Sequence, residues 1–230
     1  MLKNFSITVL RNSAFGVGAH FAIKLLSFVF TVLIVRNLGP TIYGQYAAVL
    51  AFTEAFAVLS DLGLSPYSVR QIARWREAEN AHQRASSLYG NVILIRMILS
   101  LITLFVVVGA AWLTGRPIVL IGAIGLNALV FFLYAVQGAN EAVLSGFERL
   151  DIISVAQVFY RAFFVVAGGA VLLLKLGYFG LIVANLFGVS LLALICWRRV
   201  KILGISFGPI NPREWLNLLR ASIPFGIIGF

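Results

Sequence analysis

The sequence has few of the residues from which catalytic, metal and disulfide sites are built. Its single cysteine, Cys196, cannot form a disulfide within the chain, and its two histidines, His20 and His82, are too far apart to suggest a zinc site. It also has no glycine-rich phosphate loop, no nucleophile elbow and no pair of carboxylates at a useful spacing. We therefore expect no metal, no cofactor and no enzymatic activity.

Charged residues are scarce as well. They make up 11% of the 230 residues, whereas soluble domains contain about 25%. Hydrophobic residues make up 61%, and the mean hydropathy is +0.99. The 18 lysines and arginines outnumber the 8 acids, which in a soluble domain would suggest nucleic-acid binding. In a chain this apolar the cations belong in loops instead, so we predict an all-α integral membrane protein with no nucleic-acid partner.

Long apolar runs predict six complete membrane spans, each near the 20 residues that a helix needs to cross about 30 Å of hydrocarbon. Together they form a six-helix transmembrane lobe over residues 1–200. The first run is too long for a signal peptide and is interrupted by Lys24, so we expect it to stay uncleaved. The spans are expected at about residues 12–35, 41–62, 88–113, 118–138, 152–174 and 178–197.

The last thirty residues predict a linker and the beginning of a seventh span. Asn211-Pro212-Arg213-Glu214 is typical of a helix start, and the residues that follow have one apolar face. Residues 201–220 therefore predict a cytoplasmic linker with an amphipathic helix, which either lies on the inner membrane surface or serves only as a connection. Residues 221–230 are apolar but too short to cross. We expect a chain cut inside its seventh span and a partner six-helix half.

The basic residues predict the orientation, because lysine and arginine stay on the cytoplasmic side of the membrane. Twelve fall on the side of the N-terminus and three on the other side, so the N-terminus of this multi-pass cell-membrane protein is expected to be cytoplasmic. The twelve are Lys3, Arg11, Arg70, Arg74, Arg76, Arg84, Arg149, Arg198, Arg199, Lys201, Arg213 and Arg220, and the three are Arg36, Arg116 and Lys175.

Ionisable residues inside the spans are the candidates for function, because a charge at bilayer depth costs on the order of 2.5–3.5 kcal/mol. Three cations and one acid suggest a positively charged cavity that suits a phosphate or pyrophosphate. His20 lies four residues before Lys24 and hence on the same helix face. We predict that Lys24, His20, Arg96 and Arg161 bind the substrate and that Glu54 tunes Lys24 or carries a coupling ion.

Each of these residues also has a structural interpretation that the sequence leaves open. Lys24 and Glu54 lie at similar distances from the turn near Gly39, so they could form an ion pair that fixes helix packing. A histidine in an apolar run is commonly a hydrogen-bonded packing residue. Arg96 and Arg161 could extend back to the headgroups.

Four short segments, in order along the whole chain, carry a resemblance to a known family. They are RNLGPTIYGQY at residues 36–46, DLGL at 61–64 followed by Arg70, QG at 137–138 with GFER at 146–149, and RASIP at 220–224. With this topology the chain resembles the Wzx-type polysaccharide (O-antigen oligosaccharide) flippases, in the superfamily that also holds the multidrug/toxin extruders (MATE) and lipid II flippases.

The resemblance implies the N-terminal lobe of a V-shaped, MATE-like transporter of 12 to 14 helices. It implies movement of an undecaprenyl-pyrophosphate-linked oligosaccharide across the cytoplasmic membrane by alternating access, for which a lone six-helix bundle would need a partner or its missing C-terminal half. In related flippases a basic residue of the first span lines the cavity, and Lys24 occupies a comparable place. Membrane lipids, a glycan polymerase and glycosyltransferases are the further partners it implies for polysaccharide and lipopolysaccharide biosynthesis.

Two other functions stay open at this stage. A drug or cation antiporter of the same superfamily needs acidic residues in its cavity, and one acid against three bases in the spans disfavours it. A non-transporting membrane scaffold for glycan assembly would need no substrate contacts in the spans.

Overall fold

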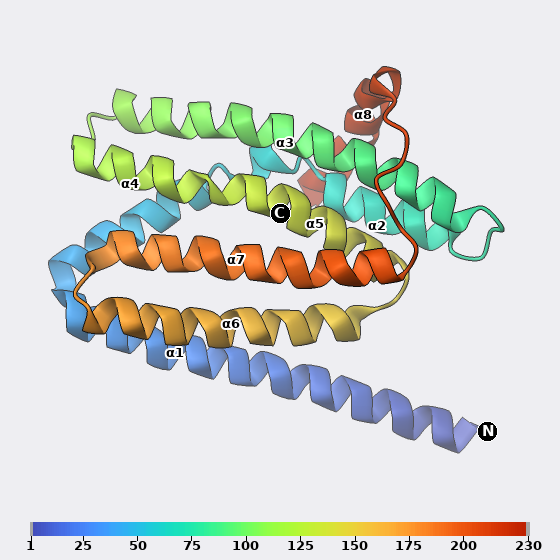
Figure 1. The fold of residues 1–230 in the computed structure, drawn as a ribbon, viewed down its shortest axis with the longest axis horizontal. Helices are drawn as coiled ribbons and strands as arrows, with labels where there is room; N and C mark the ends of the chain where they lie inside the picture. The colour runs from blue at the N-terminus through green and yellow to red at the C-terminus, as the bar shows by residue number, and fades with distance from the viewer. Residues whose placement is uncertain (1, 229–230) are drawn as a thin grey trace.

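The computed structural model describes the backbone of residues 2–228 and the side chains of residues 24–226. This part of the chain is helical and contains no strand (Figure 1). Its elements are α1 (Leu2–Glu54), the 3-10 helix η1 (Ala57–Ser60), α2 (Leu64–Trp75), α3 (Ala81–Leu113), α4 (Ile118–Ala128), α5 (Val130–Gly146), α6 (Leu150–Leu173), α7 (Gly177–Ile202) and α8 (Pro212–Ile228).

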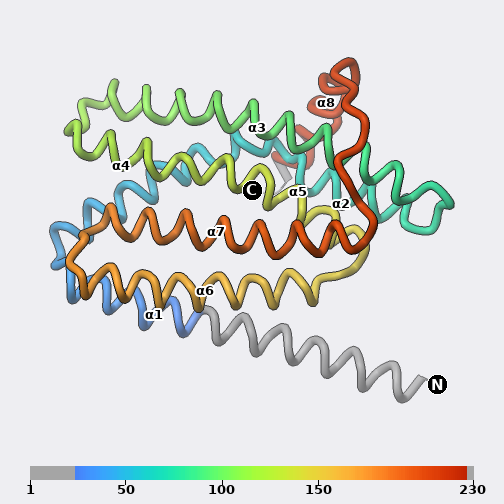
Figure 2. Tube along the Cα trace, viewed as in Figure 1, coloured from blue at the N-terminus to red at the C-terminus, as the bar shows by residue number. Residues whose placement is uncertain are grey.

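The helix α1 consists of two arms joined at Gly39. This glycine has φ 77° and ψ 163°, and Pro40 follows it. A positive φ favours glycine, and proline lacks the N–H that would continue the helical ladder, so the pair ends one arm and starts the next. Figure 2 shows the trace reversing here and returning along the bundle. The turn predicted near Gly39 is confirmed.

Five of the described helical segments are long and apolar enough to cross a membrane. They are Lys24–Glu54, Ala81–Leu113, Ile118–Gly146, Leu150–Leu173 and Gly177–Ile202. The first contains both arms of α1, so the expected count of six spans rests on each arm crossing separately and stays a prediction. The seventh span also stays a prediction, since α8 is not among the five.

The connections gather at the two ends of the bundle (Figure 1). The α2–α3 loop, the α5–α6 turn and the linker after α7 lie at one end, and the Gly39 bend, the α3–α4 turn and the α6–α7 turn lie at the other. At the first end Arg76 forms an ion pair with Glu148, and this carboxylate raises the pKa of Arg76. The pairing ties the end of α2 to the α5–α6 turn.

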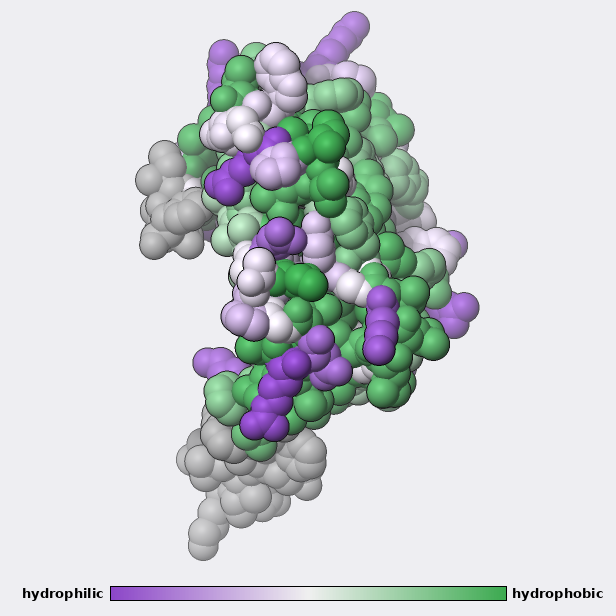
Figure 3. Space-filling model, turned by 90° about the vertical axis from the view of Figure 1, so that its left-hand side faces the viewer, coloured by the Kyte–Doolittle hydropathy of each residue, from purple (hydrophilic) through white to green (hydrophobic). Residues whose placement is uncertain are grey.

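Large apolar side chains cover the outside of the bundle. Phe105 is 69% exposed, Val166 74% and Phe187 64%, on three different helices. Figure 3 shows the end of the bundle that carries the short turns, where hydrophilic side chains are scattered over a surface that is otherwise mostly hydrophobic. So much exposed apolar area around a buried core fits a lipid environment.

Three helix boundaries differ from the sequence prediction. The polar segment between the predicted spans 41–62 and 88–113 contains α2 and the first turns of α3. Helix α2 forms because Leu64, Ser68 and Ile72 recur every four residues and bury one face. The span expected at residues 118–138 is divided at Leu129 and continues to Gly146. The surface helix and the start of the seventh span are one helix, α8, which begins at the predicted Pro212.

The linker between α7 and α8 is fastened along α3 by Asn91. Its side-chain oxygen accepts hydrogen bonds from the backbone N–H of Asn211 (2.9 Å) and from Nε1 of Trp215 (2.7 Å). Its side-chain nitrogen donates to the carbonyl oxygens of Ser87 (2.8 Å) and Pro209 (3.1 Å). Asn91 is 2% exposed, so this intramembrane amide has a structural role.

Gly208 allows the linker to approach α3 closely, and Gly208→Ala is expected to destabilise the fold by about 1–3 kcal/mol. The added Cβ would lie 2.6 Å from the backbone carbon of Ser86 and the backbone nitrogen of Ser87. It would displace the hydrogen bond from the Gly208 N–H to Ser86 (3.1 Å). Thermal unfolding of the purified protein in detergent measures the loss.

Gly169→Ala is the matched control for this prediction, because a Cβ there has nothing within 4 Å and stands within helix α6. It is expected to be neutral or stabilising by up to about 1 kcal/mol. Equal unfolding temperatures for the two variants would contradict the close packing of the linker.

Candidate functional site: a polar cavity inside the helix bundle

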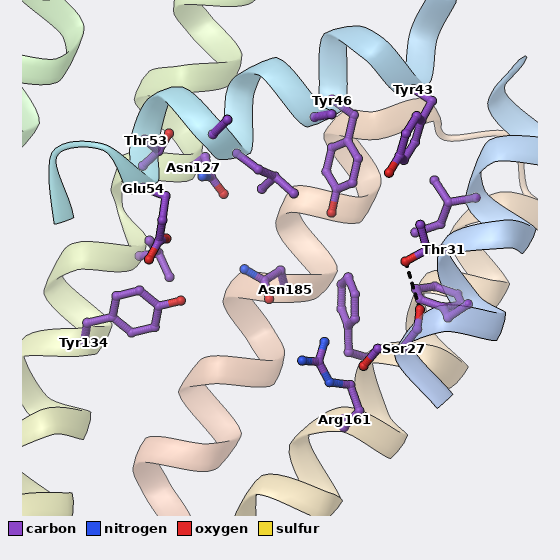
Figure 4. A pocket seen from close by; sticks show the side chains of 17 residues that line it. Ser27, Thr31, Tyr43, Tyr46, Thr53, Glu54, Asn127, Tyr134, Arg161 and Asn185 are labelled. Carbon is purple, nitrogen blue, oxygen red and sulfur yellow. Dashed lines mark hydrogen bonds between the residues drawn. The ribbon is translucent and has the colours of Figure 1, made fainter. Parts of the chain in front are cut away.

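A cavity of about 510 Å³ lies between both arms of α1 and helices α4 to α7 (Figure 4). Its walls combine aromatic rings with hydroxyl, amide and charged groups, which is typical of a ligand-binding pocket. The polar lining residues are Ser27, Thr31, Tyr43, Tyr46, Thr53, Glu54, Asn127, Tyr134, Arg161 and Asn185.

The bend at Gly39 creates two of the walls. The first arm of α1 contributes Ser27, Thr31 and Ile34, which follow helical spacing along one face. The returning arm contributes residues from Tyr43 to Glu54. A straight helix would carry these two groups far apart, so the glycine–proline pair brings them to one cavity.

Arg161 on α6 is the cation of this lining. Figure 4 shows its guanidinium pointing into the cavity. Its Cζ lies 5.5 Å from the centre of the Tyr160 ring, and its Nε is buried without a hydrogen-bond partner. Glu54 also lines the cavity, and in the described residues it forms no ion pair with Arg161. A guanidinium that points into a cavity and forms no ion pair with the carboxylate there is suited to an anionic or hydroxyl-rich ligand.

Two asparagines add fixed polar groups to the wall. Asn185 accepts a hydrogen bond from the Tyr160 hydroxyl at 2.7 Å, which holds its amide in place. Asn127 is 4% exposed, and its Oδ1 is buried without a partner. An unsatisfied buried acceptor costs about 1–3 kcal/mol. In the described part of the chain two lining residues thus carry a buried polar atom without a hydrogen-bond partner, Arg161 at Nε and Asn127 at Oδ1.

The predicted site residues fall into three groups. Arg161 and Glu54 line the cavity. Lys24 is exposed and outside the lining, but it lies three residues before Ser27 on the same helix face. The side chain of His20 lies outside the described residues. In the described part of the chain Lys24 and Glu54 form no ion pair.

Arg96 forms a separate buried cluster. It is 4% exposed, and its Nη1 lies 3.2 Å from Oδ1 of Asp61 and donates to Oγ of Ser65 at 2.7 Å. Its guanidinium packs directly on Gly138, where any Cβ would overlap it. The structure thus places Arg96 in an ion pair away from the cavity, at segments that the family resemblance singled out.

Several lining residues were not among the predicted site residues. Asn185 is the one amide in the apolar run 178–197, a signal that the sequence does contain. Tyr43, Tyr46 and Tyr134 give no comparable signal, because tyrosines are common in membrane helices. Among the described residues no group of three or more histidine, cysteine or carboxylate side chains could hold a metal ion.

A comparison with protein families identifies the family of this chain. Residues 9–230 match the family described as polysaccharide biosynthesis protein. The chain belongs to this family. The match confirms the family membership that the sequence predicts. A search among curated proteins found no match.

A solved structure supports the fold. The chain is similar to the crystal structure of a point mutant of a MATE protein, with a TM-score of 0.62 and 18% sequence identity. The match covers 91% of this chain and 50% of the MATE chain. At this identity the likeness shows a shared fold, and the chain spans about half the length of that protein. The predicted MATE-like helical architecture is confirmed at that level.

Proposed function

We propose that this chain is one six-span lobe of a flippase that moves an undecaprenyl-pyrophosphate-linked oligosaccharide across the cytoplasmic membrane. The observation that carries the proposal is the cavity itself, a polar pocket with Arg161 and Asn127 unsatisfied inside an apolar bundle of the polysaccharide biosynthesis family. A second lobe facing this cavity would complete a vestibule for alternating access. In this proposal each arm of α1 crosses the membrane, and the N-terminus is cytoplasmic.

Arginine and lysine would contact the pyrophosphate, and the aromatic and amide groups would contact the sugar. Arg161 lines the cavity, and Lys24 continues its wall one turn toward the N-terminus of α1. Flat aromatic faces such as Tyr46 and Tyr134 offer apolar contact, while amides such as Asn185 hydrogen-bond hydroxyls. The lipid tail would remain in the bilayer beside the exposed apolar helices.

Complementation tests the proposal. The whole protein, expressed in bacteria that lack their own oligosaccharide flippase, is expected to restore glycan at the cell surface. If lipid-linked oligosaccharide instead accumulates on the inner leaflet while the protein is inserted in the membrane, the proposed function is wrong.

Glu54 favours one alternative, a cation or drug antiporter, because a carboxylate in the cavity attracts cations. In that case the whole protein would confer resistance to cationic dyes, and Glu54→Gln would abolish the resistance. Under the flippase proposal dye resistance is unchanged by either form of the protein, so the two functions predict opposite outcomes of the same assay.

A further inference from the structure

The last turns of α7 carry a cluster of exposed cations, Arg198, Arg199 and Lys201. In the described part of the chain none of these three residues takes part in an ion pair. The sequence contains no aspartate or glutamate between Asp151 and Glu214. The three residues, which we call the α7 cation cluster, therefore hold positive charge that no acid close in the sequence compensates.

The carboxylates at the α5–α6 turn, which lies at the same end of the bundle, have other partners (Figure 1). Glu148 forms an ion pair with Arg76, and Oδ1 of Asp151 lies 3.7 Å from Nε of Arg149. Like charges gathered at one place on a surface create a positive potential that attracts anions. The α7 cation cluster is therefore free to attract an anion from outside the chain.

An exposed face of α7 leads along the helix to this cluster. Its five residues recur at helical spacing, so they lie on one side of the helix. They are Val183, Phe187, Leu194, Trp197 and Lys201. Asn185, which lines the cavity, is two residues away from both Val183 and Phe187, which is about 200° around the helix. The exposed face of α7 therefore lies opposite the cavity, on the side that faces the surrounding lipid.

The residues along this face change from apolar to aromatic to cationic, which is the order of a bilayer from its core to its headgroups. Trp197 is 37% exposed, and Nζ of Lys201 lies 4.0 Å from the centre of its ring. Tryptophan is enriched at the level of the headgroups. The cation–π contact holds the ammonium group next to the indole, and Ile202 beside it is 75% exposed. Both apolar and charged groups are thus presented at the depth of a lipid headgroup.

We propose that the end of α7 binds the headgroup of an anionic glycerophospholipid. Arg198 and Lys201, three residues apart and hence on one face, contact the phosphate, and Arg199 adds to the positive potential. Trp197 lies at the level of the glycerol, and the acyl chains run along the apolar part of the exposed face. The lipid lies outside the cavity, so this site does not depend on which substrate the cavity takes.

Native mass spectrometry of the whole protein in detergent tests the proposal. The protein is titrated with phosphatidylglycerol or with phosphatidylcholine that has the same acyl chains. The wild type is expected to bind phosphatidylglycerol about 10-fold or more tightly, because each lysine or arginine near a headgroup contributes about fivefold to the affinity for an anionic lipid. Equal affinity for the two lipids would overturn the proposal and leave the cluster to an acidic protein partner.

A double variant, Arg198→Gln with Lys201→Gln, assigns the binding to this site. It is expected to weaken phosphatidylglycerol binding about 10- to 30-fold and to leave phosphatidylcholine binding unchanged. Arg198→Lys with Lys201→Arg retains both charges and should bind as the wild type does. Wild-type affinity for phosphatidylglycerol in the glutamine variant would overturn the proposal.

Arg116→Gln with Lys175→Gln is the matched control. It removes the same charge from two exposed cations at the other end of the bundle, so phosphatidylglycerol binding should stay at the wild-type level. Arg161→Ala locates the lipid relative to the cavity and should also retain this binding. Loss of phosphatidylglycerol binding in Arg161→Ala would place the lipid in the cavity and overturn the proposal.

Discussion

Arg161→Ala is expected to reduce glycan export by the whole protein about 10- to 100-fold. Charge-assisted hydrogen bonds contribute about 1.5–3 kcal/mol, and this side chain points into the cavity with its Nε unpartnered. Arg161→Lys is expected to fall between the wild type and the alanine variant, because lysine retains the charge but loses the planar fork that fits a phosphate. Surface glycan, normalised to the amount of inserted protein, is the measurement.

Lys175→Gln is the control for Arg161→Ala. Lys175 is an exposed cation in the α6–α7 turn, away from the cavity lining, so its loss changes net charge by the same amount. Export should remain at the wild-type level. If Arg161→Ala also exports glycan fully, Arg161 has no contact with the substrate in transport.

Lys24→Ala tests whether Lys24, which the resemblance favours, or Arg161, which lines the cavity, contributes more to binding the anionic group of the substrate. The resemblance implies that Lys24, as the basic residue of the first span, lines the cavity, whereas the described lining contains Arg161 and lacks Lys24. A larger loss of export in Lys24→Ala than in Arg161→Ala would mean that the substrate extends along α1 beyond the pocket. The reverse order would place its anionic group beside Arg161.

Much of the helical architecture could be predicted because its signals are local. Apolar runs mark helices that lipid surrounds, and Gly39-Pro40 marks the bend through backbone geometry alone. The Asn211-Pro212 helix start was predictable for the same reason. Helix α2 was missed because its polar residues resemble a loop, and only Leu64, Ser68 and Ile72 at a spacing of four reveal its buried face.

The site could be predicted only partly, because hydropathy gives the depth of a residue but not the neighbour that it faces. Arg96 and Arg161 are both cations inside predicted spans. The structure places one against Asp61, which is distant in sequence, and the other in the cavity. Depth alone cannot separate them, since the difference lies in which helix packs opposite. Asp61 stands at the end of a predicted span, where its partner cannot be read from spacing.

Arg96→Met is expected to destabilise the protein by about 3–5 kcal/mol, the largest stability loss among these variants. Methionine fills a similar volume but leaves the Asp61 carboxylate without its cation, and removing one partner of a buried ion pair costs this much. Denaturant unfolding of the purified protein, followed by tryptophan fluorescence, measures the change. Arg198→Met, at an exposed cation near the end of α7, should change stability by less than about 0.5 kcal/mol.

Adding Asp61→Asn to Arg96→Met shows how much of the stability loss in Arg96→Met comes from the lost ion pair and how much comes from altered packing. If the cost of Arg96→Met comes from the stranded carboxylate, the double variant should be more stable than Arg96→Met alone. The gain has a structural limit, because Asp61 also accepts hydrogen bonds from the backbone and the hydroxyl of Ser65, at 3.2 and 2.9 Å, and asparagine keeps one acceptor there. A double variant as unstable as the sum of the two single variants would show that Arg96 and Asp61 are not energetically coupled, which would contradict the ion pair as the source of the cost.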